Sequence, residues 1–87
     1  MAFADIGFGN VVNVDRIVSV VSAEAAPTKR IISAAKEKSL AVDATCGKKT
    51  KSVLIMDSGH IILSAKSAER IMQKIENPQA RYNDDEE

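Results

Sequence analysis

Apolar residues along the chain fall into short runs that predict a strand-rich protein with two helices. The run 17–21 is rich in β-branched residues and is typical of a strand. Residues 57–60 have the composition of a tight turn, so the apolar runs on either side of them should form an antiparallel hairpin. Strands are expected at 3–8, 11–14, 17–21, 40–45, 52–56 and 61–63.

Two further segments carry apolar residues at helical spacing. The first is expected to begin near Pro27, because proline is tolerated in the first turn of a helix, and to reach about Lys38. The second should begin after Ser67, a favourable N-cap residue, and end at Asn77, which precedes a proline. Its spacing places Met72 on the side that faces the core.

The predicted order is β-β-β-α-β-β-β-α, which indicates an α+β fold with a small mixed β-sheet and two helices. A strand, a helix and a strand at 17–45 have the form of a crossover between parallel strands. The runs 53–56 and 61–63 are apolar without alternation, as in strands covered on both faces. Two short helices cannot easily cover both faces of five or six strands, so a homo-oligomer is predicted. The alternative is that the helices divide between the two faces.

The length of 87 residues is that of one domain, expected at 1–76, followed by an acidic and disordered tail at 77–87. One cysteine and one histidine form neither a disulfide nor a metal site, so no metal or cofactor is predicted. No basic leader and no apolar run of about 20 residues is present. We therefore expect a cytoplasmic protein without a membrane partner.

The formal net charge is zero, but the charges are segregated along the chain. Residues 29–51 hold seven basic and two acidic residues, and 76–87 hold five acidic and one basic. Lys48, Lys49 and Lys51 lie between two predicted strands, where they either solvate a loop or neutralise phosphates. The cations of the first helix are interpreted as a solvated face, with a recognition helix as the alternative. If the acidic tail competes with DNA for the basic patch, deleting 77–87 should tighten DNA binding.

Enzymatic motifs are not supported by the spacing. A P-loop would need glycine at Val42 and serine or threonine at Lys49. Cys46 and His60 are separated by a whole strand, so a thiol nucleophile with a histidine base is not expected. Cys46 is predicted to be a small, semi-buried side chain, and the chain is predicted not to be an enzyme.

Taken in order, several segments resemble the small bacterial RemA-type regulators of extracellular-matrix (biofilm) genes. The resemblance covers about residues 5–72. The matching segments are Ile6-Gly7-Phe8-Gly9-Asn10-Val11-Val12, Asp15-Arg16-Ile17-Val18-Ser19-Val20-Val21-Ser22, Ala26-Pro27-Thr28-Lys29-Arg30, Val42-Asp43-Ala44-Thr45-Cys46-Gly47-Lys48-Lys49-Thr50-Lys51 and Val53-Leu54-Ile55-Met56-Asp57-Ser58-Gly59-His60-Ile61-Ile62-Leu63-Ser64.

The resemblance implies a nucleoid-associated transcriptional regulator that binds double-stranded DNA as a ring-like homo-oligomer. Carried over by position, the DNA-binding residues are Arg16, Lys48, Lys49 and Lys51. From the residues alone, Arg16 reads as a local ion pair with Asp15. This chain has lysines where the family tends to have arginines after the glycine, which favours phosphate binding over bidentate reading of guanine. An RNA-binding module and a protein-interaction scaffold are the competing functions.

Overall fold

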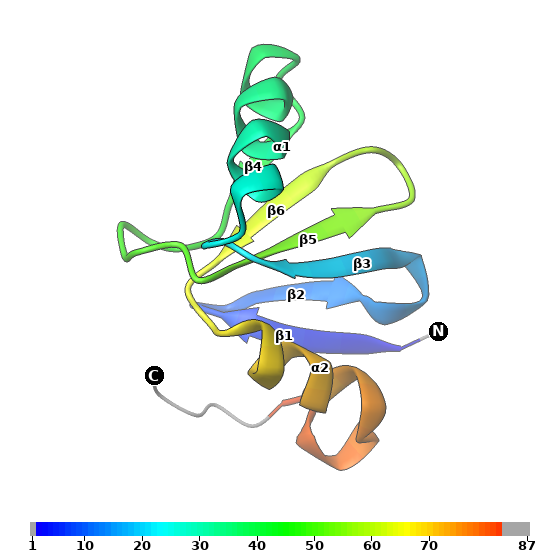
Figure 1. The fold of residues 1–87 in the computed structure, drawn as a ribbon. Coiled ribbons are helices and arrows are strands. Elements are labelled where there is room, and N and C mark those ends of the chain that lie inside the picture. The colour runs from blue at the N-terminus through cyan, green and yellow to red at the C-terminus, as the bar shows by residue number, and fades with distance from the viewer. Residues whose placement is uncertain (1, 83–87) are drawn as a thin grey trace.

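The computed structural model describes residues 2–82 and places the chain in the α+β class, as predicted. The elements follow one another in the expected order, with two additional 3-10 turns (Figure 1). They are β1 (Phe3–Gly7), β2 (Asn10–Asn13), η1 (Val14–Arg16), β3 (Ile17–Ser22), α1 (Ala26–Glu37), β4 (Ala41–Asp43), β5 (Ser52–Met56), β6 (Ile61–Ser64), α2 (Ala68–Glu76) and η2 (Pro78–Ala80).

Four strands form one mixed sheet in the order β3-β5-β6-β4. β5 pairs antiparallel with both β3 and β6, whereas β4 runs parallel to β6. β3 and β4 therefore point in the same direction, as expected for a strand-helix-strand unit, but two other strands lie between them. The hairpin β5–β6 is antiparallel, as predicted, with Leu54 opposite Ile62.

The first two strands form a separate two-stranded sheet, so the main sheet has four strands and the expected five or six is wrong. β1 and β2 pair antiparallel around Phe8 and Gly9, which have φ of 55° and 80°. Positive φ at both central residues is the pattern of a type I′ turn, whose twist matches that of a hairpin. Asn10 Nδ2 donates a 2.9 Å hydrogen bond to the Gly7 carbonyl and holds the turn. The strand predicted at 3–8 thus ends at Gly7.

Two hydrophobic clusters lie on opposite faces of the four-stranded sheet. On one face Leu54 packs in a cluster with Ile6 of β1 and Ile71 of α2. On the other face Val53 packs in a cluster with Ala35 of α1. Leu54 and Val53 are adjacent in β5, so their side chains point to opposite faces of the sheet. Both have 0% exposure because both faces are covered at this strand.

This division of the cover explains why β5 is apolar without alternation. The hairpin and α2 cover one face, and α1 covers the other. The helices thus divide between the faces, which was the alternative to cover by a second copy of the chain. The burial of β5 by itself therefore does not require a partner subunit.

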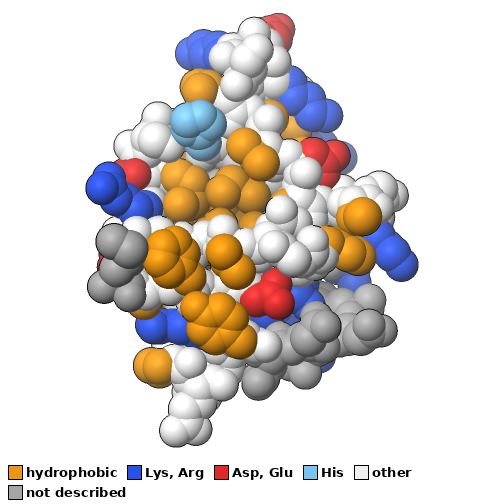
Figure 2. Space-filling model, turned by 180° about the vertical axis from the view of Figure 1, so that it is seen from behind, with side chains coloured by type: hydrophobic (Ala, Val, Ile, Leu, Met, Phe, Trp, Pro, Cys, Tyr) orange, Lys and Arg blue, Asp and Glu red, His pale blue; other side chains and the backbone are white. Residues whose placement is uncertain are grey.

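One region of the sheet nevertheless carries apolar side chains that the chain leaves partly uncovered. Val42 of β4 is 47% exposed and lies opposite Ile62, which lies opposite Leu54 on the next strand. Ile62 and Met56, on the same face as Leu54, are only partly buried. We call Val42, Met56 and Ile62 the open apolar face. Figure 2 shows hydrophobic side chains gathered beside the single histidine, on the side of the molecule turned away from the view in Figure 1.

Recognisable local signals mark the end of α1 and the start of α2. α1 closes with the amide of Leu40 bonded to the Ala35 carbonyl, 2.8 Å, and with Ser39 at a φ of 61°, the arrangement of a Schellman motif. α2 begins as predicted, with the Ser67 hydroxyl accepting a 3.2 Å bond from the Arg70 amide. Met72 is 39% exposed, so its predicted place in the core is wrong.

The C-terminal segment is ordered further than expected. η2 and Arg81 lie within the predicted tail at 77–87, and both are part of the fold. The Arg81 carbonyl accepts a 2.8 Å bond from the Asp5 amide, and its guanidinium donates to the carbonyls of Lys74 and Ile75. The acidic residues 83–87 lie outside the described part of the chain. Among residues 2–82, no helix combines the length and the hydropathy needed to cross a bilayer.

Candidate nucleic-acid interface

The predicted lysine cluster lies on the loop between β4 and β5, which projects at one edge of the molecule (Figure 1). Thr45 fixes the start of this loop, because its amide and hydroxyl both donate to Asp43 Oδ1, at 2.9 and 2.6 Å. A tight turn follows, in which the Lys48 amide donates to the Thr45 carbonyl at 3.0 Å. The end is fixed by a 2.8 Å bond from the Lys51 amide to the Ser64 carbonyl. The loop is therefore held at both ends.

The turn inside this loop repeats the geometry of the hairpin turn. Cys46 and Gly47 have φ of 54° and 83°, again positive at both central residues. This conformation directs the chain outward before the lysines, and Lys48, Lys49 and Lys51 are all exposed. Cys46 is exposed too, so the expectation of a semi-buried thiol is wrong.

Asp43 is the electrostatic anchor of the loop. The hydrogen bond from the Thr45 hydroxyl, followed by that from the Thr45 amide, holds the pKa of Asp43 below its ordinary value of 3.8, and the charge of Lys36 acts in the same direction. Asp43 is therefore ionised at neutral pH. Its negative charge is engaged within the loop base, and the lysines lie beyond it in the chain.

The β3–α1 junction lies against the same loop. Ser22 at the end of β3 is paired with Ser52 at the start of β5, and the Ala23 amide donates to the Lys51 carbonyl at 3.1 Å. The Thr28 hydroxyl donates to the Ser22 carbonyl at 2.8 Å and fixes the start of α1. As a result, the positive end of the α1 dipole faces the edge that carries the lysines.

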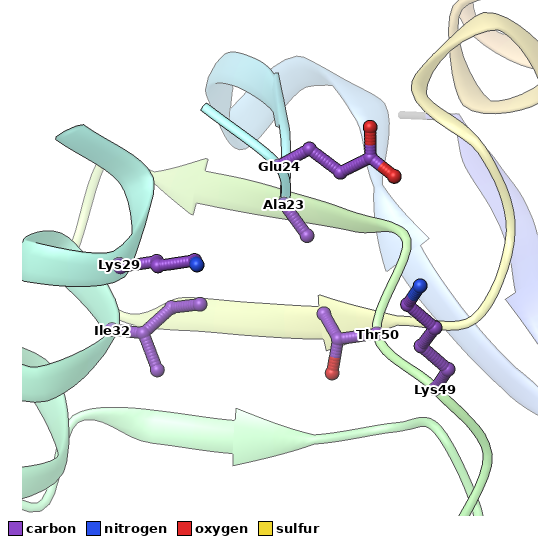
Figure 3. A pocket seen from close by; sticks show the side chains of 6 residues that line it. All are labelled: Ala23, Glu24, Lys29, Ile32, Lys49 and Thr50. Atoms are coloured by element: carbon purple, nitrogen blue, oxygen red, sulfur yellow. The ribbon is translucent and has the colours of Figure 1, made fainter. Parts of the chain in front are cut away.

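An open pocket of about 420 Å³ lies between α1 and the lysine loop. In Figure 3, Lys29 extends into it from α1, and Lys49 reaches toward it from the loop. Glu24 reaches over from the β3–α1 junction, so one carboxylate accompanies the two ammonium groups. The remaining lining residues are Ala23, Ile32 and Thr50.

The tip of the β1–β2 hairpin belongs to this edge as well. The Ser64 hydroxyl donates to the Ile6 carbonyl at 3.0 Å, and the Ser64 carbonyl accepts from the Lys51 amide. One residue of β6 thus joins the end of β1 to the end of the lysine loop. Lys66 runs beneath the hairpin turn: it is 6% exposed, and a Cβ on Gly7 would lie 3.5 Å from its Cε.

Arg16, the fourth predicted site residue, lies at the opposite end of β5. Its carbonyl accepts a 2.9 Å bond from the Asp57 amide, and its Nη1 lies 3.1 Å from Asp57 Oδ2. The sequence alone suggested an ion pair between Arg16 and Asp15, which is wrong, because the partner is Asp57. Both members of the ion pair are well exposed, 65% and 44%, so the pair contributes at most about 1 kcal/mol.

A single chain therefore brings the three lysines together but keeps Arg16 apart from them. β5 has five residues, which at about 3.3 Å per residue separates its ends by roughly 17 Å. The sequence did not predict that Lys29 and Lys49 line the same pocket. That proximity follows from the pairing of β3 with β5, which local sequence patterns do not reveal.

Cys46 and His60, the residues of a possible nucleophile and base, also lie far apart. His60 lies in the β5–β6 turn with its Nδ1 2.7 Å from the Ser58 hydroxyl. Cys46 lies on the lysine loop, beyond the other end of β5. The two side chains therefore do not form a nucleophile and base pair.

Three bacterial proteins similar to this chain carry names that point to a regulatory role. A protein of Carboxydothermus hydrogenoformans is 52% identical over 73 residues, which cover 84% of each chain. One of Acetivibrio thermocellus is 47% identical over 89 residues, covering 100% of this chain and 96% of that protein. One of Synechococcus elongatus is 50% identical over 76 residues, 87% of each. The name of each begins with the words "Putative regulatory protein".

Residues 3–75 match the sequence pattern of the RemA-like family, described as extracellular matrix regulatory protein A-like. The chain belongs to this family, as the resemblance in the sequence indicated. Family and relatives point to a regulatory role and not to an enzyme.

Proposed function

We propose that this protein is a cytoplasmic, nucleoid-associated transcriptional regulator of extracellular-matrix (biofilm) genes, and that it binds double-stranded DNA as a homo-oligomer. The observation that carries the proposal is the rigid edge with Lys48, Lys49 and Lys51 exposed on it. Lys29 and the start of α1 add positive potential at the same edge. A regulatory role agrees with the family to which the chain belongs.

One copy of the chain presents too few basic groups to bind DNA tightly. Its edge offers about three or four phosphate contacts, and such contacts weaken steeply with salt. Copies held in one assembly bind the same duplex with a high effective concentration, so their weak contacts add up to high avidity. Oligomerisation and DNA binding are therefore one proposal.

The position of Arg16 suggests how the copies are arranged. Arg16 and the lysine loop lie at opposite ends of β5, so one chain does not combine them in one compact basic patch. In a head-to-tail ring, Arg16 of one copy lies next to the lysine loop of its neighbour, and every junction repeats the same mixed site. The ring then presents a periodic basic surface along which DNA bends.

The chemistry of the site favours backbone binding over base reading. Lysine is a point charge and lacks the planar fork with which arginine grips a guanine. Arg16 alone of the four proposed residues can make such a contact. We therefore expect weak sequence selectivity from the lysine loop and a larger share from DNA shape and deformability.

Salt-dependent binding to a random duplex tests the lysine edge. Replacing Lys48, Lys49 and Lys51 by alanine should reduce the steepness of log K against log salt by about one for each phosphate contact removed, and weaken binding to all duplexes alike. The matched control replaces Arg30 and Lys36 on α1 and Lys38 at its C-cap, an equal change of charge. Unchanged binding by the loop variant contradicts the proposal, and loss of binding by the control variant points to α1 as a recognition helix.

A mixing experiment tests the head-to-tail site. Arg16→Ala and the triple lysine variant are each expected to bind DNA weakly. If the site combines both elements from neighbouring copies, refolding the two variants together restores intact junctions and part of the affinity. If binding is not restored although mixed oligomers form, the site does not span two copies.

A protein-interaction scaffold is the second candidate, and the open apolar face favours it. A scaffold would retain its regulatory activity in the triple lysine variant, whereas a DNA-binding regulator would lose it; altering the apolar face should impair both. RNA binding is distinguished by competition between duplex DNA and RNA for the same protein; the low aromatic content of 3% argues against base stacking on single strands.

A further inference from the structure

Phe8 at the tip of the β1–β2 hairpin occupies a position that its chemistry does not suit. Its φ of 55° lies in the left-handed region, where a side chain with a Cβ is strained and where asparagine or glycine is usual in this type of turn. The ring is also 52% exposed, so burial does not explain its presence. Neither the backbone conformation nor packing in the core therefore explains a phenylalanine at this position.

The turn is held rigidly although it is exposed. Asn10 Nδ2 bonds to the Gly7 carbonyl at 2.9 Å, and the Gly7 amide donates to Asp5 Oδ1 at 2.7 Å. Lys74 is 3% exposed, and its ammonium donates to the Asp5 carbonyl at 2.8 Å. An exposed aromatic ring is thus mounted on a stiff two-residue tip. Strained residues that the surrounding structure holds in place concentrate at functional sites.

The charged surroundings of this tip indicate what it contacts. Ser64 links Ile6, two residues before Phe8, to the end of the lysine loop, so the ring stands on the basic edge. An exposed apolar ring at the edge that also carries exposed lysines complements a duplex, whose phosphates flank the apolar faces of its stacked bases. A single ring on a narrow tip also fits the minor groove, which is about 6 Å wide and too narrow for the whole hairpin.

We propose that Phe8 is a wedge that enters the minor groove and partly unstacks one base step, which bends the duplex around the assembly. Phenylalanine is among the apolar residues that minor-groove proteins insert in this way. The inference depends on the proposed DNA binding. It adds a source of bending that needs no charged contact, and it gives a reason for the strained conformation.

Variants at position 8 test the wedge without disturbing the fold. Phe8→Asn and Phe8→Gly remove the ring and accept a positive φ, so their melting temperatures should be at or above that of the wild type. Phe8→Leu keeps an apolar wedge. Phe3→Ala is the matched control, because Phe3 is a partly exposed phenylalanine at the other end of the same hairpin.

The measurements are affinity as a function of salt, bending of an end-labelled random duplex by energy transfer, and oligomer mass. Phe8→Asn and Phe8→Gly should bind about tenfold more weakly, with an unchanged salt slope and loss of bending, since each lost base contact is an uncharged stacking interaction. Phe8→Leu and Phe3→Ala should remain close to wild type.

Each outcome decides between the proposals. Wild-type bending by Phe8→Asn overturns the wedge while leaving the lysine edge intact. A lower oligomer mass for the position-8 variants overturns it in a different way, by making Phe8 a contact between copies. If the wild-type chain shows no salt-dependent binding to duplex DNA, the proposed function itself fails, and the wedge fails with it.

Discussion

At the scale of the residue, the ion pair between Arg16 and Asp57 adds little to the stability of the fold. Its larger effect is on whether the Arg16 guanidinium is available to bind DNA. This guanidinium lies 3.1 Å from Asp57 and remains 65% exposed. A guanidinium has five N–H donors, so the pair leaves donors for a phosphate or a base. The Asp57 carboxylate nevertheless competes with a nucleic-acid phosphate for the same group.

Asp57→Asn should therefore strengthen DNA binding. The backbone bond from residue 57 to Arg16 is retained, while an exposed pair of up to about 1 kcal/mol is removed, so a gain of roughly two- to fivefold at low salt is expected. Fluorescence anisotropy with a labelled duplex measures the change. Asp15→Asn is the matched control, because it alters the charge next to Arg16 without releasing the guanidinium. Equal gains for both variants would show that only net charge matters.

At the scale of the element, the β4–β5 loop depends on Asp43 at its base. The folded pKa of Asp43 is lowered by the Thr45 hydrogen bonds. The ionised carboxylate therefore stabilises the fold fully above the ordinary value of 3.8, and this contribution is lost as pH falls through the lower folded value.

Asp43→Ala should thus reduce stability at neutral pH and have a smaller effect in acid. Denaturant midpoints of the wild type and the variant are compared at neutral pH and in steps below 3.8, where the difference between them should shrink. The variant should also bind DNA more weakly at neutral pH, since the start of the lysine loop loses its two anchoring bonds. A pH-independent difference in stability would contradict the assigned role.

The elements themselves were largely predictable, and their arrangement was not. The β-branched run of β3 and the serine cap of α2 are local signals, and both elements form where these signals place them. The separation of β1 and β2 from the main sheet is decided by which strands pair, and alternation does not encode partners. Met72 fits the helical spacing of a core residue, but the buried residues of α2 are Ile71 and Lys74, and Met72 is 39% exposed.

The candidate site divides in the same way. Lys48, Lys49 and Lys51 are adjacent in sequence, so one loop was sufficient to bring them together. Arg16 entered through resemblance, and its separation from the lysines follows from the antiparallel pairing of β3 and β5. The positive φ of Phe8 could not be predicted from the sequence, because asparagine or glycine, and not phenylalanine, is the usual residue at this position of the turn.

At the scale of the whole molecule, the two sides of the sheet are covered unequally. α1 packs on one face, whereas the hairpin and α2 leave Val42, Met56 and Ile62 partly open on the other. This open apolar face is the surface we expect copies of the chain to bury in the proposed ring.

Val42→Lys should break the assembly without unfolding the chain. Val42 is 47% exposed, so the folded monomer accommodates the longer side chain, but an unpaired ammonium buried between copies costs on the order of several kcal/mol. Light scattering should then give the 9.4 kDa monomer. Val18→Lys, at a valine that is 67% exposed on β3, is the control and should keep the wild-type mass. If both variants keep it, copies do not meet through this face.

The bond between the Asp5 amide and the Arg81 carbonyl has a practical consequence for shortened chains. A chain cut after residue 76 loses this acceptor and also the guanidinium that binds the last carbonyls of α2. The free margin of β1 then becomes a template for a strand of another molecule, and aggregation would obscure any gain in DNA affinity. Competition by the acidic terminus is better probed by a cut at residue 83, which leaves this closure intact.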